Sequence, residues 1–83
     1  MPYFIYIIYS AKNNKYYIGC CGDLEVRLAQ HNGGRNISTK SGIPWKLMYT
    51  ETFDSFTEAR RRELEIKKKK SRKYLEWLIS EVQ

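Results

Sequence analysis

The sequence has only two cysteines and one histidine among its 83 residues. Cys20 and Cys21 are adjacent, and neighbouring cysteines rarely bridge each other, so a framework of disulfides is excluded. The sequence also has no Cys-x-x-Cys pair and no Cys/His cluster, so it lacks the ligand spacing of a structural zinc site. We therefore expect two reduced thiols in a cytoplasmic protein.

Long apolar stretches are missing as well. The aromatic and aliphatic run from Phe4 to Tyr9 has six residues, whereas a membrane-spanning helix needs about 20. No cleavable signal follows this run. The sequence therefore predicts a protein that does not use a membrane as its partner.

Acidic residues are scarce: nine Asp and Glu stand against 15 Lys and Arg, which gives a net charge of +6. The segment from Phe56 to Lys73 contains nine of the basic residues and three of the acidic ones, so the rest of the chain is neutral. A charge excess confined to one segment favours an anionic partner such as nucleic acid. A solvated helix face is the alternative explanation.

The length and the 42% hydrophobic content predict one small domain, residues 1–83. Local patterns predict elements in the order strand, strand, helix, strand, helix, helix. Their expected ranges are about 3–10, 16–20, 23–32, 45–53, 55–70 and 71–82. The polar, glycine-containing stretch from Arg35 to Pro44 is expected to be a mobile loop. Three strands need helices to cover them, so the fold class is a small layered α+β domain, ββαβαα.

The first strand is apolar on both faces, which predicts a central place in the sheet with cover on both sides. Period two puts Tyr6 on one face with Phe4 and Ile8, and Tyr17 on one face with Gly19. The same alternation predicts a common face for three residues of the third strand: Trp45, Leu47 and Tyr49.

Glu63 is a carboxylate where an apolar residue is expected. On a helical wheel it falls near the middle of the apolar arc of the second helix. That arc consists of Phe56, Ala59, Leu64 and Ile66. An unpaired buried carboxylate is unfavourable, so Glu63 needs a partner or a function. A buried ion pair with Arg60 or Lys67 is one explanation, and binding of a hard cation such as Mg²⁺ is the other.

Two tyrosines and two polar helix residues complete the candidate site. Tyrosines in strands are most often structural, and it is the shared context with Arg27 and His31 that singles out Tyr6 and Tyr17. Arg27 can bind a phosphate with two parallel hydrogen bonds, or it can be a solvated residue covering Leu24. His31 can be a general base, because its pKa lies near neutrality, or a surface or capping residue.

In this arrangement the chain resembles the GIY-YIG nuclease superfamily, most closely its small stand-alone bacterial members of the UPF0213 type. Tyr17-Ile18-Gly19 is the second signature intact, and Phe4-Ile5-Tyr6 occupies the first, with phenylalanine in place of the leading glycine. Arg27 and Glu63 follow in the order of the family. The resemblance covers almost the whole chain. It implies a three-stranded antiparallel sheet flanked by helices.

The resemblance also implies catalytic roles. Tyr6 would help to activate the attacking water as a general base, and Tyr17 would orient the phosphate or the hydrated metal. Arg27 would stabilise charge on the phosphoryl group, and His31 would assist proton transfer. Gly19 would provide room at the end of the strand.

Glu63 would bind one divalent cation, Mg²⁺ or Mn²⁺, that polarises the phosphate. The expected nucleic-acid contacts come from basic residues: Arg27, Arg35, Lys40, Lys67, Lys68, Lys69 and Lys70. The chain is thus expected to be a metal-dependent endonuclease that hydrolyses phosphodiester bonds in DNA, in repair or recombination. A non-catalytic nucleic-acid-binding module on the same scaffold and a module that docks a protein partner remain alternatives.

Overall fold

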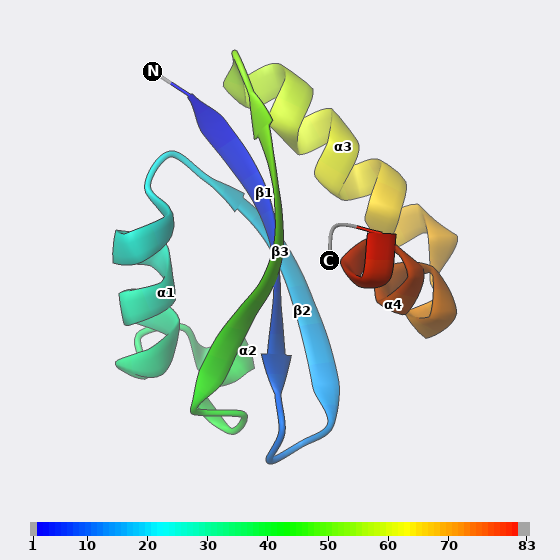
Figure 1. Ribbon diagram of the computed structural model, residues 1–83. Coiled ribbons are helices and arrows are strands. Elements are labelled where there is room, and N and C mark those ends of the chain that lie inside the picture. Colours follow the sequence, from blue (N-terminus) through cyan, green and yellow to red (C-terminus); the bar gives the residue numbers. More distant parts are fainter. Residues whose placement is uncertain (1, 82–83) are drawn as a thin grey trace.

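The computed structural model describes residues 2–81 and consists of a three-stranded antiparallel sheet with helices on both faces (Figure 1). The strand order is β2-β1-β3. The elements are β1 (Tyr3–Ser10), β2 (Lys15–Cys21), α1 (Leu24–Asn32), α2 (Ile37–Lys40), β3 (Trp45–Phe53), α3 (Phe56–Lys69) and α4 (Arg72–Glu81). The predicted α+β class is confirmed. The predicted extension of the last helix to Val82 lies outside the described residues.

The central strand β1 separates two apolar clusters. Ile5 and Ile7 belong to the α3-side core, which is completed by Ala59, Ile66, Leu78 and Ile79. Tyr6 and Ile8 belong to the α1-side core, together with Cys21 and Trp45. Figure 1 shows α1 and α2 on one side of the sheet and α3 and α4 on the other. Because successive side chains of a strand point to opposite faces, an all-apolar β1 fills both layers.

The third strand departs from simple alternation. Ile7 pairs with Tyr49 and Ile8 pairs with Leu47, so β3 carries one extra residue, Met48, at this point. Such a bulge reverses the facing of the residues beyond it. Trp45 therefore packs in the α1-side core, whereas Tyr49 packs against the α3-side core. The prediction of a common face for these two residues was wrong.

The stretch from Arg35 to Pro44, expected to be a mobile loop, contains the short helix α2. Asn36 caps it, because its side chain accepts a hydrogen bond of 3.0 Å from the backbone N–H of Ser38. Thr39 within α2 is completely buried. This segment thus closes one end of the α1-side core.

Helix α3 begins at the predicted place and buries a narrower stripe than the wheel predicted. Ser55 caps it by accepting a hydrogen bond of 3.2 Å from the backbone N–H of Glu58. Its buried residues are Ala59, Glu63 and Ile66. Phe56 and Leu64, assigned to the buried arc, are 52% and 50% exposed. The buried face of α3 is therefore a single row of residues with Glu63 at its centre.

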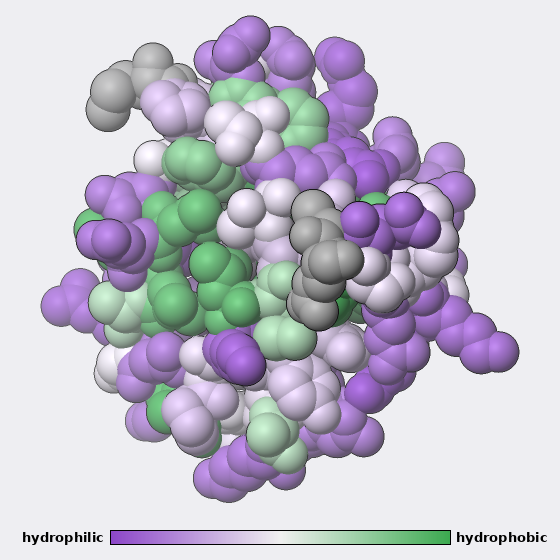
Figure 2. Space-filling view, in the orientation of Figure 1, coloured by the Kyte–Doolittle hydropathy of each residue, from purple (hydrophilic) through white to green (hydrophobic). Residues whose placement is uncertain are grey.

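The surface is mixed in character. Figure 2 shows hydrophilic side chains around the rim of one face and hydrophobic ones gathered between α1 and β3. In the part of the chain that the structure describes, no helix has the length and the apolar character needed to cross a membrane.

Candidate active site

A chain of buried hydrogen bonds joins β1, α1 and α2. The hydroxyl of Tyr6 lies 2.9 Å from Nε2 of His31. Nδ1 of the same ring lies 2.8 Å from the hydroxyl oxygen of Thr39. His31 is only 1% exposed, so its imidazole is held from both sides in the α1-side core. The burial of His31 excludes the alternative of a surface histidine.

The direction of these hydrogen bonds is assigned from their third member, Thr39. The hydroxyl of Thr39 donates to the backbone carbonyl of Asn36 at 3.3 Å, so it accepts from Nδ1–H of His31. Nε2 then carries a lone pair, and the phenol of Tyr6 donates to it. The neutral imidazole is thus oriented to receive the Tyr6 proton.

Gly19 gives the Tyr6 ring its place. The two residues are partners in the register of β1 and β2. A Cβ atom at position 19 would lie 2.6 Å from Cζ of the Tyr6 ring, a separation that van der Waals repulsion forbids. The ring of Tyr6 can therefore extend across β2 only because residue 19 has no side chain.

Tyr17 and Arg27 lie next to this chain of hydrogen bonds. The ring centroid of Tyr17 is 5.1 Å from that of His31, in an edge-to-face arrangement. Arg27 and His31 contribute to the wall of a cavity of about 340 Å³ between α1 and α2. The other lining residues are Gln30, Arg35, Asn36 and Ile37. The cavity thus combines an imidazole with two guanidinium groups, a combination suited to an anionic ligand.

Burial and nearby charge keep Tyr6 and His31 neutral near pH 7. Burial raises the pKa of Tyr6 above its usual 10, against the opposing effect of the Arg27 charge. Burial and Arg27 together lower the pKa of His31 below 6.5. Tyr6 is therefore a phenol rather than a phenolate in this state. It can take a proton from water only as it passes its own proton to His31.

Glu63 lies on α3, on the other face of the sheet from Tyr6 (Figure 1). One carboxylate oxygen accepts a hydrogen bond of 2.8 Å from Arg60, and the other accepts one of 2.6 Å from Lys67. Burial alone would raise the pKa of Glu63, but the hydrogen bonds from these two cations outweigh it and lower the pKa. Burial and the nearby Glu63 carboxylate raise the pKa of the Cys20 thiol to about 11.

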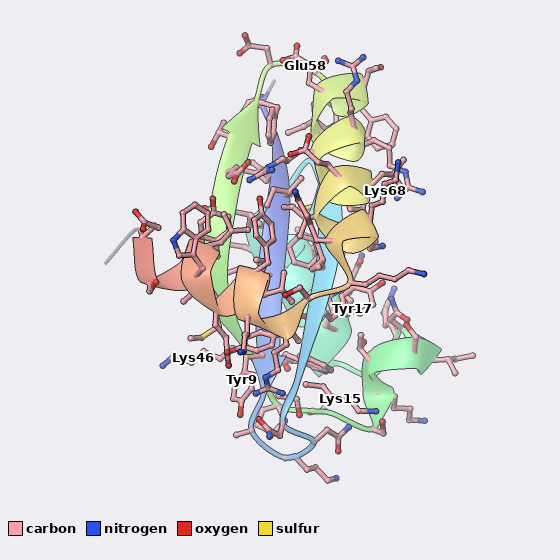
Figure 3. All side chains as sticks on the ribbon, turned by 90° about the vertical axis from the view of Figure 1, so that its right-hand side faces the viewer. Tyr9, Lys15, Tyr17, Lys46, Glu58 and Lys68 are labelled. Carbon is pink, nitrogen blue, oxygen red and sulfur yellow. The ribbon has the colours of Figure 1, made fainter. Side chains whose placement is uncertain are left out.

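The candidate residues on the α1 side of the sheet approach those on α3 at the outer edge of β2. The side chain of Lys67 extends from α3 toward this edge, and its Nζ lies 6.0 Å from the ring centroid of Tyr17. Figure 3 shows Tyr17 beside the C-terminal end of α3. The structure therefore brings Tyr6, Tyr17, Arg27 and His31 together and connects them to Glu63 through Lys67.

The donor set limits the metal that can bind. Within residues 2–81 no group of three His, Cys, Asp or Glu side chains is arranged to hold a metal ion. A single carboxylate still fits Mg²⁺, which keeps several waters and is bound through one or two carboxylates plus substrate phosphate. Both oxygens of Glu63 are engaged by Arg60 and Lys67, so a cation has to displace at least one of them.

The basic residues expected to contact nucleic acid are dispersed. Arg35 lines the cavity beside His31, and Lys40 is exposed at the end of α2. In the lysine run, Lys67 binds Glu63 and Lys69 lies 5.4 Å from the ring centroid of Tyr74. Lys68 points away from the sheet (Figure 3). These lysines therefore do not form one uniform strip.

Sequence reasoning missed Thr39, which orients His31 from inside the stretch predicted to be a loop. Asn36 and Ser38, a helix-capping pattern, are the local signal for α2. That signal predicts a turn of helix, but it does not predict that the Thr39 hydroxyl contacts His31. This contact depends on how α2 folds back against α1.

Comparison with known proteins finds the same family as the resemblance in the sequence. The model of the GIY-YIG catalytic domain family matches residues 2–75. A UPF0213 protein of Staphylococcus saprophyticus is 41% identical over 80 residues, covering 95% of each chain. A UPF0213 protein of Staphylococcus haemolyticus is 42% identical over 66 residues, covering 78% of this chain and 79% of its own.

A solved structure supports the same assignment. The solution NMR structure of a UPF0213 protein from Bacillus halodurans superposes with a TM-score of 0.58 and is 33% identical. The match covers 96% of this chain and 84% of that one. Its extent confirms the expected nuclease-type fold, and the chain belongs to the GIY-YIG catalytic domain family, with UPF0213 proteins among its relatives.

Proposed function

We propose that this protein is a metal-dependent endonuclease that hydrolyses phosphodiester bonds in DNA, with a role in repair or recombination. The observation that carries the proposal is the buried hydrogen bond from Tyr6 to Nε2 of His31. A backbone carbonyl would satisfy the hydroxyl of a buried structural tyrosine equally well. An imidazole can in addition take up the proton of that hydroxyl. Here the base is oriented by a further buried residue, Thr39.

The proton path follows from the directions of these hydrogen bonds. As water attacks phosphorus, its proton moves to the Tyr6 oxygen while the Tyr6 proton moves to Nε2 of His31. His31 becomes an imidazolium, and its Nδ1–H stays bound to Thr39. A base positioned in this way contributes about 10²- to 10⁴-fold to the rate. The raised pKa of Tyr6 requires that the two transfers are coupled.

Arg27 and Tyr17 act on the phosphate. Arg27 lines the cavity next to His31, where its guanidinium can bind two phosphate oxygens and stabilise the charge that develops on them. Tyr17 lies between this cavity and Lys67, so its hydroxyl is available to orient the same phosphate. A strand bound across the edge of β2 would contact both groups.

Glu63 is the residue that would hold Mg²⁺ or Mn²⁺. When bound, the cation would polarise the phosphate and stabilise the leaving oxygen. Lys67 and Arg60 are about half exposed at their side chains, so they can turn from Glu63 toward substrate phosphates. Exchange of these partners would couple the binding of DNA to the release of the Glu63 carboxylate.

A second function is supported by the same ion pairs. Because both oxygens of Glu63 are already neutralised, the residue can be a structural member of α3. The domain would then be a nucleic-acid-binding module without turnover. In that case DNA binding depends on salt, through release of counterions from the phosphates, but not on a divalent cation.

The test compares the protein with its Glu63→Ala variant on supercoiled, branched and single-stranded DNA, each with Mg²⁺, Mn²⁺ or EDTA. We expect metal-dependent nicking that the variant loses, while its DNA binding stays the same or improves because a negative charge is gone. Salt-sensitive binding without cleavage by the unmodified protein would favour the binding module. Unfolding of the variant would assign Glu63 to the structure and remove it from the metal site.

A further inference from the structure

A second cavity, of about 360 Å³, lies between the outer part of β2 and the junction of α3 with α4. It is on the opposite face of β2 from His31, and the proposed reaction does not use it. We propose that this groove binds an unpaired nucleotide of the DNA strand that is cleaved, with the base in the groove and the neighbouring phosphates on its rim. The inference rests on the proposed function in taking DNA as the ligand.

The floor of the groove is apolar. Ile18 from β2, Ile66 from α3 and Leu75 from α4 line it, and the ring of Tyr16 forms one wall. Such a surface offers favourable contact to a flat aromatic group that leaves water. A phosphate or a free metal ion would gain nothing from these side chains, so the floor selects a ligand with an apolar face.

The rim of the groove is cationic. Lys15, Lys67, Lys70 and Arg72 are the charged residues that line it. The Arg72 guanidinium lies 5.0 Å from the ring centroid of Tyr16, so a flat cation and an aromatic ring meet at one end. Lys67 and Arg72 also pair with Glu63 and Glu76, and Lys15 and Lys70 add positive charge without a salt bridge in the described residues.

An apolar floor with a cationic rim matches single-stranded nucleic acid better than a duplex. In a duplex the flat faces of the bases are stacked on one another, and only base edges, sugars and phosphates are accessible. No base face of a duplex would therefore reach the floor of the groove. An unpaired base exposes its face and can stack on or pack against protein side chains. The cavity is also the size of a single small ligand rather than of a helix.

The groove adjoins the candidate catalytic site at Lys67. Lys67 lines the groove, binds Glu63 and approaches the ring of Tyr17. Tyr16 and Tyr17 are neighbours in β2, so their side chains point to opposite faces of the sheet. A strand that crosses the outer edge of β2 therefore passes from the groove to Tyr17, and the bound base would select strands that are unpaired next to the cleaved bond.

The test uses NMR of the metal-free protein with labelled methyl groups. We expect a short oligothymidylate to shift the methyl signals of Ile18 and Leu75, and a blunt duplex to leave them in place. The Lys15→Glu variant should bind the oligothymidylate about tenfold more weakly, because a rim cation becomes an anion. Lys46→Glu is the matched control: it makes the same change in charge at an exposed strand residue outside the groove (Figure 3).

Two results would overturn the proposal that the groove binds a nucleotide while leaving the nuclease proposal intact. One is binding of the oligothymidylate without a response of these methyl groups. The other is an equal loss of affinity in the Lys15→Glu and Lys46→Glu variants. If the strand enters the groove but no DNA is cleaved with any metal, the groove stands and the nuclease proposal fails. If neither single strands nor duplexes bind, both proposals fail.

Discussion

The phenol of Tyr6 in β1 donates a hydrogen bond of 2.9 Å to Nε2 of His31, a residue 25 positions further along the chain in α1. The partners are buried, and Gly19 provides the space in which they meet. This hydrogen bond links β1 to α1, and the ring of Tyr17 links β2 to the same histidine through an edge-to-face contact. Its contribution to stability and to chemistry can be separated experimentally.

The first prediction concerns the hydroxyl of Tyr6. Tyr6→Phe keeps the ring and leaves Nε2 of His31 without a donor, so we expect a loss of about 1–3 kcal/mol of unfolding free energy. DNA cleavage should fall about 100-fold or more if the phenol carries the proton. Tyr9→Phe is the control, because its hydroxyl binds Asn14 at an exposed site. Equal cleavage by the two variants would remove Tyr6 from the reaction.

The second prediction concerns the space beside Tyr6. Gly19→Ala would place a Cβ atom against the ring and displace it from His31. We expect about 1–3 kcal/mol of destabilisation and a loss of cleavage that added metal does not restore. Gly22→Ala is the control, because its Cβ atom would lie at an ordinary 3.7 Å from Tyr3. Denaturant unfolding measures the stability of each variant, and DNA nicking measures its cleavage. A fully active Gly19→Ala protein would contradict the proposed role of the space beside Tyr6.

The third prediction concerns pH. The pKa of His31 is lowered from 6.5 by burial and by Arg27. On acidification the histidine of the unfolded chain therefore takes up a proton before that of the folded protein. The stability that depends on neutral His31 is fully present above pH 6.5 and is lost as the pH falls through the folded pKa. The carboxylates Glu51 and Glu63 have pKa values lowered from 4.5 and titrate below this window.

Urea unfolding at several pH values tests this dependence. His31 is the single histidine of the chain, so His31→Gln should make stability independent of pH between about 7 and 5. Cleavage by the unmodified protein should decline over the same range, because a protonated imidazole cannot accept the Tyr6 proton. An unchanged slope in His31→Gln would assign the pH dependence to other groups.

The fourth prediction concerns competition for Glu63. Lys67→Ala removes one of the two cations that bind the carboxylate, so we expect the DNA-free protein to bind Mn²⁺ about threefold to tenfold more tightly. Calorimetric titration measures the affinity. Lys68→Ala is the control, since this lysine is on the same helix and points away from the sheet (Figure 3).

A further variant makes the fourth prediction specific. The gain in Mn²⁺ affinity should disappear when Lys67→Ala is combined with Glu63→Ala. An equal gain in Lys68→Ala would indicate a general effect of net charge. No gain in Lys67→Ala would show that the lysine does not compete with the cation.

Several parts of the fold could be predicted because their causes are local. Asp23 caps α1 through a hydrogen bond of 3.1 Å from the backbone N–H of Val26, and this depends on the residue type and its place before the helix. The apolar character of β1 on both faces predicted cover on both sides, and the structure confirms it. The alternation of β3 failed as a guide because the bulge at Met48 is set by pairing with β1.

The order and spacing of the candidate residues can be read from the sequence. Strand periodicity also predicts the face of the sheet on which Tyr6 and Tyr17 lie. The sequence by itself also determined the family and the uneven charge. Only the tertiary structure decided that His31 is buried between Tyr6 and Thr39 and that Glu63 lies across the sheet, neutralised by Arg60 and Lys67. The physical reason is that these contacts join residues on different elements, so they depend on how β1, β2 and the helices pack.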